Sequence, residues 1–419
     1  MRQRDRLLCF LIILTCMAIP SARSLEIYLN NTANVSDPDG TYLKPFKSFS
    51  QAYNAVIHSN INQQAIVVYF MASSVAYDVS MDVELTGNEP NGINLTFTSL
   101  VNTSSFPVTC SELPKINVMD PYIKIKSSST SFHFSYLTIS SYSGNKTLSV
   151  MDIESAGNAL IGYKDVCFEA TAQTVSQSSK FLSINSYGLL EFDMSNIMFD
   201  GVFSWNLISI LDIHANNKYN INLENMMFTF KTEDYARPTS APAFSFKGSS
   251  EFSEGSTLNM KNIQLTNISA QNLSCAYFSF AEVSNVMIRD VLVQNVSNLL
   301  PVDSTNSELR LFKFQNLNVE LSLNMQSITL SNANNTSIIS IASSINSLNI
   351  SDVLIENSII SSSYYFNLAA VYDCDPVTTI NQLYMDKVVI TGSSLNSVVK
   401  IQGICDTDME PHNPLVPPY

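Results

Sequence analysis

The sequence predicts an all-β protein, a single-stranded parallel β-helix with three short strands in each of about 12 coils. Three observations support this fold class: an apolar motif that recurs along the chain, asparagine or aspartate at a fixed place beside it, and a scarcity of charge. Only 14% of the 419 residues are charged, whereas ordinary soluble domains have about 25%. Because 45% are hydrophobic, the chain still has enough apolar material for a large core.

Residues 1–24 have the pattern of a secretory signal peptide. Three arginines (Arg2, Arg4 and Arg6) precede an apolar segment over residues 7–18, and small residues surround Arg23 at a suitable cleavage position. A membrane-spanning helix needs about 20 apolar residues, so this shorter segment predicts cleavage near Leu25 rather than a membrane anchor. We therefore expect an exported protein whose mature chain has no membrane span.

Residues 25–65 are expected to form an N-terminal cap. A short amphipathic helix is predicted where Phe49, Tyr53, Val56 and Ile57 share one face, and Ser48 is a suitable N-cap residue. Because a β-helix ends in an open apolar coil, such a helix would cover the first coil. The β-helix is predicted over residues 66–405, with its first strands at 66–70, 93–97 and 116–125, and a proline-rich tail over 406–419.

Nine repeats of one apolar motif organise the predicted β-helix. Each repeat has an apolar anchor, a second apolar residue two positions later, and two more at three and five positions earlier. A spacing of two marks a strand with one buried face, and the step of three breaks that phase, so we expect a turn and a second strand there. The anchors are Leu137, Val166, Ile197, Met226, Ile263, Val291, Ile328, Val353 and Val388.

Further columns of the repeat complete each coil. Asparagine and aspartate tolerate a left-handed backbone, and in six repeats one of them precedes the anchor: Asp165, Asn196, Asn225, Asn262, Asp290 and Asp352. Similar residues follow the anchor by four positions: Gly201, Asn267, Asn295, Asn332, Asn357 and Gly392. A third, apolar-x-apolar strand is expected at Met151/Ile153, Leu182/Ile184, Ile208/Ile210, Phe244/Phe246, Phe278/Phe280, Phe312/Phe314, Ile339/Ile341, Phe366/Leu368 and Val399/Ile401.

The start of the chain resembles a known family. Asp39-Gly40-Thr41, followed by Pro45-Phe46 and by Ser48-Phe49 with Ala52, is similar to the opening motif of secreted right-handed β-helix proteins of the pectin-lyase-like superfamily. The repeated segments resemble β-helix regions of large secreted or surface proteins of ciliates and other protists. The resemblance covers nearly the whole mature chain and implies a right-handed β-helix. It implies no single function, because the superfamily includes lyases, glycosidases, adhesins and inert ectodomains.

The sequence lacks the motifs of polysaccharide-cleaving members of this superfamily. Such enzymes usually have Asp-Asp, Gly-His-Gly and Arg-x-Lys on neighbouring coils, none of which occurs here, and glycoside hydrolysis needs two carboxyl groups. None of the histidines has metal-ligand spacing: we expect His58 at the end of the cap helix, His133 outward, His214 in a loop and His412 in the tail. We therefore predict no catalytic residues, with a divergent polysaccharide lyase or glycoside hydrolase as the alternative.

Five cysteines follow the signal peptide, so at least one has no intramolecular partner. Cys374 and Cys405 follow corresponding strands of adjacent coils, about 4.8 Å apart, and we expect a disulfide between them. Cys110 and Cys167 are the second candidate pair, which leaves Cys275. Four carboxylates beside the first pair are a candidate calcium site, with solvated acids as the alternative: Asp373, Asp375, Asp406 and Asp408.

Eleven Asn-x-Ser/Thr sequons occur, against about 8 expected by chance from this composition. Asn267 and Asn295 also belong to a corner column, where an inward-facing amide would bind its neighbours above and below, so we expect no glycans there. The expected N-glycans are at Asn30, Asn34, Asn102, Asn145, Asn272 and Asn334 or Asn335.

The net charge and the expected export limit the classes of binding partner. A formal charge of −14 disfavours nucleic acid, which is bound by Lys and Arg. We expect a secreted or surface-associated, non-catalytic protein that is structural, adhesive or carbohydrate-binding, with carbohydrate or other surface proteins as partners and no cofactor apart from the calcium candidate. An ectodomain of a larger membrane protein is a further alternative.

Overall fold

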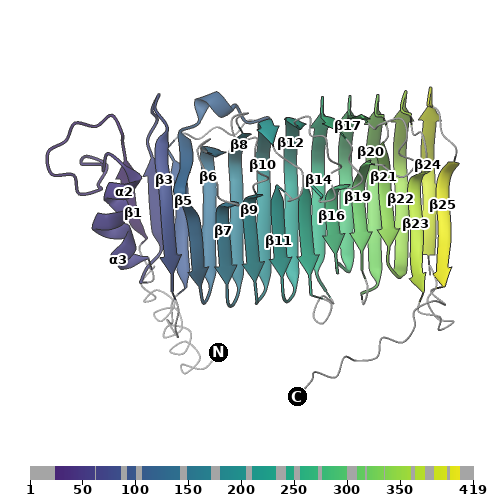
Figure 1. Ribbon diagram of the computed structural model, residues 1–419, viewed down its shortest axis with the longest axis horizontal. Coiled ribbons are helices and arrows are strands. Elements are labelled where there is room, and N and C mark those ends of the chain that lie inside the picture. The colour runs from purple at the N-terminus through teal and green to yellow at the C-terminus, as the bar shows by residue number, and fades with distance from the viewer. Residues whose placement is uncertain are drawn as a thin grey trace, which may run out of the picture.

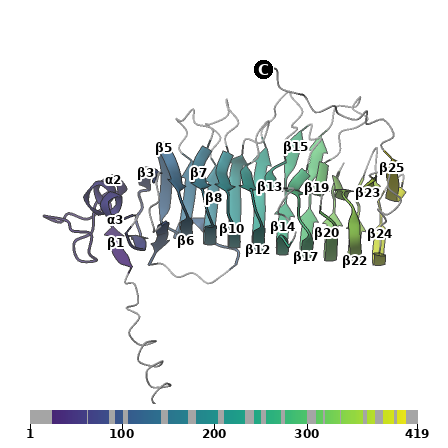
Figure 2. The same ribbon diagram turned by 90° about the horizontal axis from the view of Figure 1, so that it is seen from below.

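The protein is a parallel β-helix (Figure 1). The computed structural model describes residues 24–61, 63–85, 92–100, 106–141, 149–170, 180–203, 210–232, 242–249, 255–271, 276–299, 309–316, 319–334, 336–359, 364–372, 382–393 and 397–405. Within these residues, 23 strands form one sheet and two more form a second sheet. The coils stack along one axis, with α2 (Phe49–Ala52) at one end and β25 (Ser397–Cys405) at the other (Figures 1 and 2).

Most strands belong to two parallel ladders. We call them the long ladder and the short ladder.

The long ladder runs through β1 (Leu25–Leu29), β2 (Ile66–Phe70), β4 (Ile93–Ser99), β6 (Thr130–Ser141), β8 (Ala159–Ala170), β10 (Leu190–Phe203), β12 (Tyr219–Thr232), β14 (Thr257–Thr266), β17 (Asn285–Gln294), β20 (Leu321–Ser331), β22 (Ile345–Glu356) and β24 (Gln382–Thr391). Each of its strands comes from a separate coil, which confirms the expected 12 coils. The short ladder runs through β3 (Tyr77–Glu84), β5 (Lys115–Ser127), β7 (Ser149–Ser155), β9 (Lys180–Ser186), β11 (Leu211–Ala215), β13 (Phe244–Gly248), β16 (Ala276–Ala281), β19 (Leu309–Gln315), β21 (Thr336–Ala342), β23 (Tyr364–Tyr372) and β25. The second sheet pairs β15 (Ser269–Gln271) with β18 (Ser297–Leu299).

The step of three in the apolar motif is a bend at a left-handed residue. All nine residues that precede the anchors have φ between 51° and 58°, including Tyr136, Ser327 and Lys387, where no asparagine or aspartate stands. The bend lies inside one continuous strand, so the two strands expected from the phase break are the two arms of one bent strand. The second corner is left-handed too, with Asn267 and Asn295 at φ 56° and 53°.

The apolar columns of the motif fill the inside of the coils. Phe168, Phe199 and Phe228, all with 0% exposure, stack with ring centroids 4.8 and 5.0 Å apart. Burial of one such side chain contributes about 1.5–3 kcal/mol, and aromatic stacking about 0.5–1.5 kcal/mol more. Because each coil places the same kind of residue above its predecessor, the core is continuous along the rod.

Two local predictions in the coil of β11 are wrong. The structure pairs Leu211 with Leu182, so the third strand there contains Leu211/Ile213 rather than Ile208/Ile210. Both segments have the apolar-x-apolar pattern, and one begins three residues after the other. Only the pairing with neighbouring coils shows which of them forms the strand. In consequence His214 lies in β11 rather than in a loop, with its Nε2 3.0 Å from Asp212 Oδ1.

The N-terminal end of the rod is covered by the predicted helix. Ser48 is its N-cap, with Oγ accepting a hydrogen bond from the Gln51 N–H at 3.2 Å. After α2 the helix continues as a π-helical turn (Tyr53–Ile57) and ends in α3 (His58–Asn60). Phe49 and Ile57 are buried, and the Phe49 ring packs edge-on against Phe97 at 5.5 Å. Among the described residues no helix is long and apolar enough to span a membrane.

Candidate binding groove and disulfide

The outer side of the long ladder has a face rich in amides and hydroxyls. Side chains in the first arm of each strand alternate between core and solvent, so the positions four and six residues before each anchor point outward together. The register aligns these positions from coil to coil. We call this surface the amide face. Its residues in the C-terminal half are Asn259, Met287, Asn324, Asn349 and Tyr384 in one row, and Thr257, Asn285, Ser322, Ser347 and Gln382 in the next.

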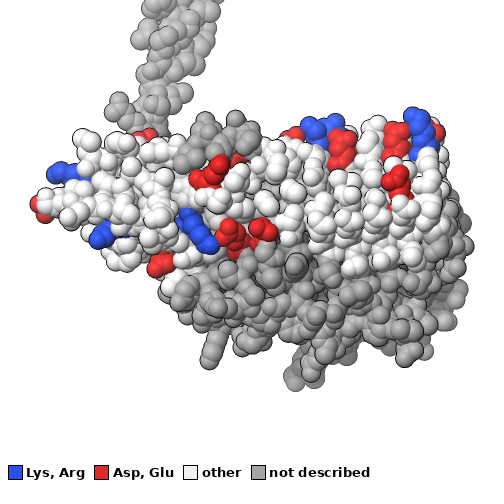
Figure 3. Space-filling model, turned by 90° about the horizontal axis from the view of Figure 1, so that it is seen from above, with Lys and Arg blue, Asp and Glu red and all other residues white. Residues whose placement is uncertain are grey.

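A groove of about 640 Å³ lies on the amide face and runs across the strands from β14 to β24. Both rows line it, Tyr384 excepted, and Arg289 is the one ionic side chain among its lining residues. Its walls therefore offer neutral donors and acceptors, and Arg289 forms no salt bridge with the residues that the structure describes. Charge is sparse elsewhere too: on the side shown in Figure 3, charged side chains gather in a few groups and most of the described surface is uncharged.

Hydrogen bonds between coils position the amides. Asn259 donates from Nδ2 to Asn222 Oδ1 at 2.8 Å, and Thr257 donates from Oγ1 to Asn220 Oδ1 at 3.0 Å. The Oδ1 atoms of Asn259 and Asn349 are buried, and no donor among the described residues reaches either of them. A buried acceptor without a donor is uncommon and costly.

Beside the groove, Lys261 and Glu224 form a salt bridge. Lys261 Nζ lies 2.9 Å from Glu224 Oε1 across adjacent coils. Both side chains are about two-fifths exposed, so this ion pair contributes little stability. The pair neutralises Glu224, and among the described residues Arg289 lines the groove without forming a salt bridge.

A second groove, of about 530 Å³, lies on the same face near the N-terminal end. Asn94, Ser131, Leu160 and Glu191 line it at the register positions that lead to Asn220 and Thr257. The two grooves are therefore parts of one outer face along the rod. The buried columns of the repeat do not reveal this face. Its signal in the sequence lies four residues before the anchors, where asparagine recurs.

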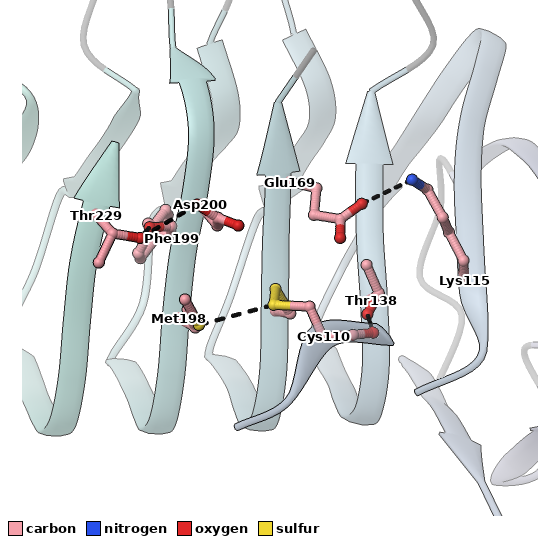
Figure 4. The surroundings of a disulfide bond; sticks show 9 residues. Cys110, Lys115, Thr138, Glu169, Met198, Phe199, Asp200 and Thr229 are labelled. Atoms are coloured by element: carbon pink, nitrogen blue, oxygen red, sulfur yellow. Dashed lines mark hydrogen bonds and ion pairs between the residues drawn. A yellow bond between two sulfur atoms is a disulfide. The ribbon is translucent and has the colours of Figure 1, made fainter. Parts of the chain in front are cut away.

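The structure forms the second candidate disulfide, between Cys110 and Cys167 (Figure 4). Their Cα atoms are 5.5 Å apart, and Cys110 lies in a short 3-10 helix (Cys110–Glu112) against the outer side of the ladder. Thr138 donates from Oγ1 to the Cys110 carbonyl at 2.8 Å, which holds this segment in place. The same two sulfurs and Glu169 are the one potential metal-ligand group found in the described part of the chain, and the disulfide leaves no thiolate to bind a metal.

The first disulfide candidate and the calcium candidate lie outside the described residues. This holds for Cys374 and for the four carboxylates Asp373, Asp375, Asp406 and Asp408. The backbone register sets Cys405 opposite Tyr372, two residues before Cys374. Both remain predictions.

The described sequons differ in their surroundings. Asn34 and Asn334 are exposed, and Asn30 is half-buried, with Oδ1 accepting hydrogen bonds from the Thr32 N–H and hydroxyl at 3.1 and 2.8 Å. Asn102, Asn145, Asn272 and Asn335 lie outside the described residues. Asn295 donates to Asn267 Oδ1 at 3.0 Å, as expected of a corner ladder, but both side chains are exposed, so the expected inward orientation is wrong.

No family model matches the chain, and no curated protein matches it. The fold is similar to the A-module of the mannuronan C-5 epimerase AlgE4 of Azotobacter vinelandii, with 12% identity and a TM-score of 0.30 over 85% of this chain and 93% of that one. It is also similar to a rhamnogalacturonan lyase, with 11% identity and a TM-score of 0.25 over 89% of this chain and 87% of that one.

Proposed function

We propose that this protein is an exported, non-catalytic β-helix that binds carbohydrate along its amide face. The observation that carries the proposal is the groove between β14 and β24, with its two aligned rows of neutral polar side chains. The rigid stack of coils holds these rows in fixed register, so the groove is organised before a ligand arrives.

The chemistry of the groove suits a sugar chain. Sugar hydroxyls donate and accept hydrogen bonds, as do the amides of Asn285, Asn324 and Asn349. Met287 is 45% exposed and offers apolar surface to the C–H faces of sugar rings. Arg289 adds one site for a carboxylate, so we expect a neutral or sparsely acidic oligosaccharide.

The proposal of a non-catalytic role follows from the same lining. Hydrolysis of a glycosidic bond needs one carboxyl group as acid and another as base or nucleophile across the bond. The lining residues include neither Asp nor Glu, and the nearby Glu224 is paired with Lys261. Binding therefore fits the groove better than cleavage.

Export is part of the proposal and rests on the N-terminal signal pattern. The Cys110–Cys167 disulfide is compatible with it, because disulfides persist in oxidising compartments. In that setting a rod of 12 coils with a rise of about 4.8 Å per coil would be roughly 55–60 Å long.

Titration calorimetry with a panel of neutral and uronic-acid oligosaccharides tests the proposal. Asn324→Ala removes one exposed groove amide, and the loss of its hydrogen bonds, about 1 kcal/mol, should weaken binding about fivefold. Gln294→Ala is the matched control, because Gln294 is an exposed amide in the second arm of β17 and does not line the groove. No binding across the panel, or equal losses in the two variants, would refute the groove as the site. Release of new reducing ends or unsaturated sugars would refute the non-catalytic role.

A further inference from the structure

The two ends of the rod are finished differently. At the N-terminal end, Phe49 and Ile57 of the cap are 1% and 0% exposed over the first coils. At the other end, β24 exposes the residues that its predecessor buries. Leu383 is 39% exposed, whereas Leu348 directly before it in the ladder is 1% exposed. Met385, Val388 and Ile390 are likewise half-buried, whereas their counterparts in β22 are buried.

The backbone at this end has a free side as well. Within the described residues β24 pairs with β22 alone, and β24 and β25 end the stack opposite α2 (Figures 1 and 2). In a parallel ladder the N–H and C=O groups alternate between the two neighbours of a strand, so one set on β24 faces away from the stack. Such an edge pairs readily with another strand.

The sequence of β24 is symmetric about its corner. Its four core-facing residues are Leu383, Met385, Val388 and Ile390, and reversal of the chain direction about the midpoint between Asp386 and Lys387 maps this set onto itself. A second copy turned by a two-fold axis through the corner therefore sets Leu383 against Ile390 and Met385 against Val388. The outward Tyr384, 58% exposed, meets Val389, 49% exposed.

The charges at the corner match this arrangement. The same axis brings Asp386 of one copy to Lys387 of the other, twice per dimer. Lys387 is 69% exposed, and its Nζ lies 3.3 Å from Asp352 Oδ1 of its own chain, which leaves the ammonium donors that face the open end available. Opposite charges therefore face each other at the centre of an apolar patch.

We propose that two copies of this chain associate end to end through β24, as a closed two-fold dimer. A head-to-tail stack is disfavoured because the cap helix covers the other end, so the association stops at two copies. The dimer doubles the length of the rod and points the two caps outward. The dimer does not rest on the proposed carbohydrate binding, although Gln382 of β24 also lines the groove.

A charge exchange tests the dimer, with mass measured by light scattering and sedimentation on the full chain. We expect twice the mass of one chain at micromolar concentration. Asp386→Lys and Lys387→Asp each set like charges together and should raise the dissociation constant at least tenfold, and the double exchange should restore the dimer. Circular dichroism and melting of each variant confirm that it folds.

Substitution of an outward-facing residue gives a second test of the dimer and leaves the core intact. Val389→Lys should dissociate the dimer, whereas Val75→Lys, at a 61% exposed valine near the N-terminal end, should leave it unchanged. A monomer at 100 µM, a double exchange that fails to restore association, or equal effects of the two lysines would overturn the proposal. So would a full chain that is monomeric and dimerises only after deletion of residues 406–419.

Discussion

The corner asparagines stabilise the rod in two separable ways, and Asn225 allows both to be measured. Asn225 has φ 54°, donates from Nδ2 to Asn196 Oδ1 at 2.8 Å and accepts from Asn262 Nδ2 at 2.8 Å. Asn225→Gly keeps the left-handed backbone and removes both hydrogen bonds, at about 1 kcal/mol each, with a further 0.5–1 kcal/mol from the flexibility of glycine. We expect a loss of about 2–3 kcal/mol.

Asn225→Ala removes the same bonds and also strains the backbone. A left-handed conformation costs an ordinary residue about 1–2 kcal/mol, so we expect a total loss of about 3–4 kcal/mol. Asn220→Ala on the same strand is the control, since this exposed residue accepts one hydrogen bond, from Thr257, and has no positive φ. Its loss should stay below about 1 kcal/mol.

Hydrogen exchange is the suitable assay, because a solenoid opens locally and its free energy of unfolding varies along the rod. The losses should appear in the amides of β10, β12 and β14. If Asn225→Gly exchanged like the wild type, the amide ladder would contribute nothing. If Asn225→Ala were as stable as Asn225→Gly, the explanation by backbone strain would be wrong.

Two further predictions concern the N-terminal half. Replacement of Cys110 and Cys167 by serine should lower stability by about 2–4 kcal/mol, because the disulfide closes a loop of 57 residues in sequence; a melting temperature that does not respond to reductant would contradict this. Burial lowers the pKa of His133, and Asp193 opposes this shift. The unfolded chain then binds a proton at higher pH than the folded one, so stability should fall as the pH drops through about 6.5. His133→Gln should flatten the melting temperature between about pH 7 and 5, and an unchanged slope would refute the assignment.

The buried columns could be predicted because they repeat. Every coil must place apolar residues inward at the same two-residue and three-residue steps, so nine weak local signals add up to a strong one. The bend at each corner does not depend on residue type alone. Tyr136, Ser327 and Lys387 have the left-handed backbone although none is an asparagine or aspartate, so the spacing of the apolar residues requires the bend.

Other features depend on contacts between distant segments. Cys110 comes from the stretch between β4 and β5, whose path no repeat describes, so the sequence alone could not establish its bond to Cys167. The third strand at β11 shifted by three residues for a similar reason, since Ile208/Ile210 and Leu211/Ile213 are equally apolar.

The sequence by itself therefore determined the class of fold, the coil length, the corners and the cap helix, because each follows from local periodicity and backbone preference. Only the tertiary structure decided which outward side chains meet. Asn259, Asn324 and Asn349 lie 25 to 90 residues apart in sequence and become one groove because coils of unequal length return to the same register. The exposure of the symmetric strand β24 is likewise decided by the tertiary structure. A strand is an edge strand only when no further strand pairs with it, and this depends on how the coils stack.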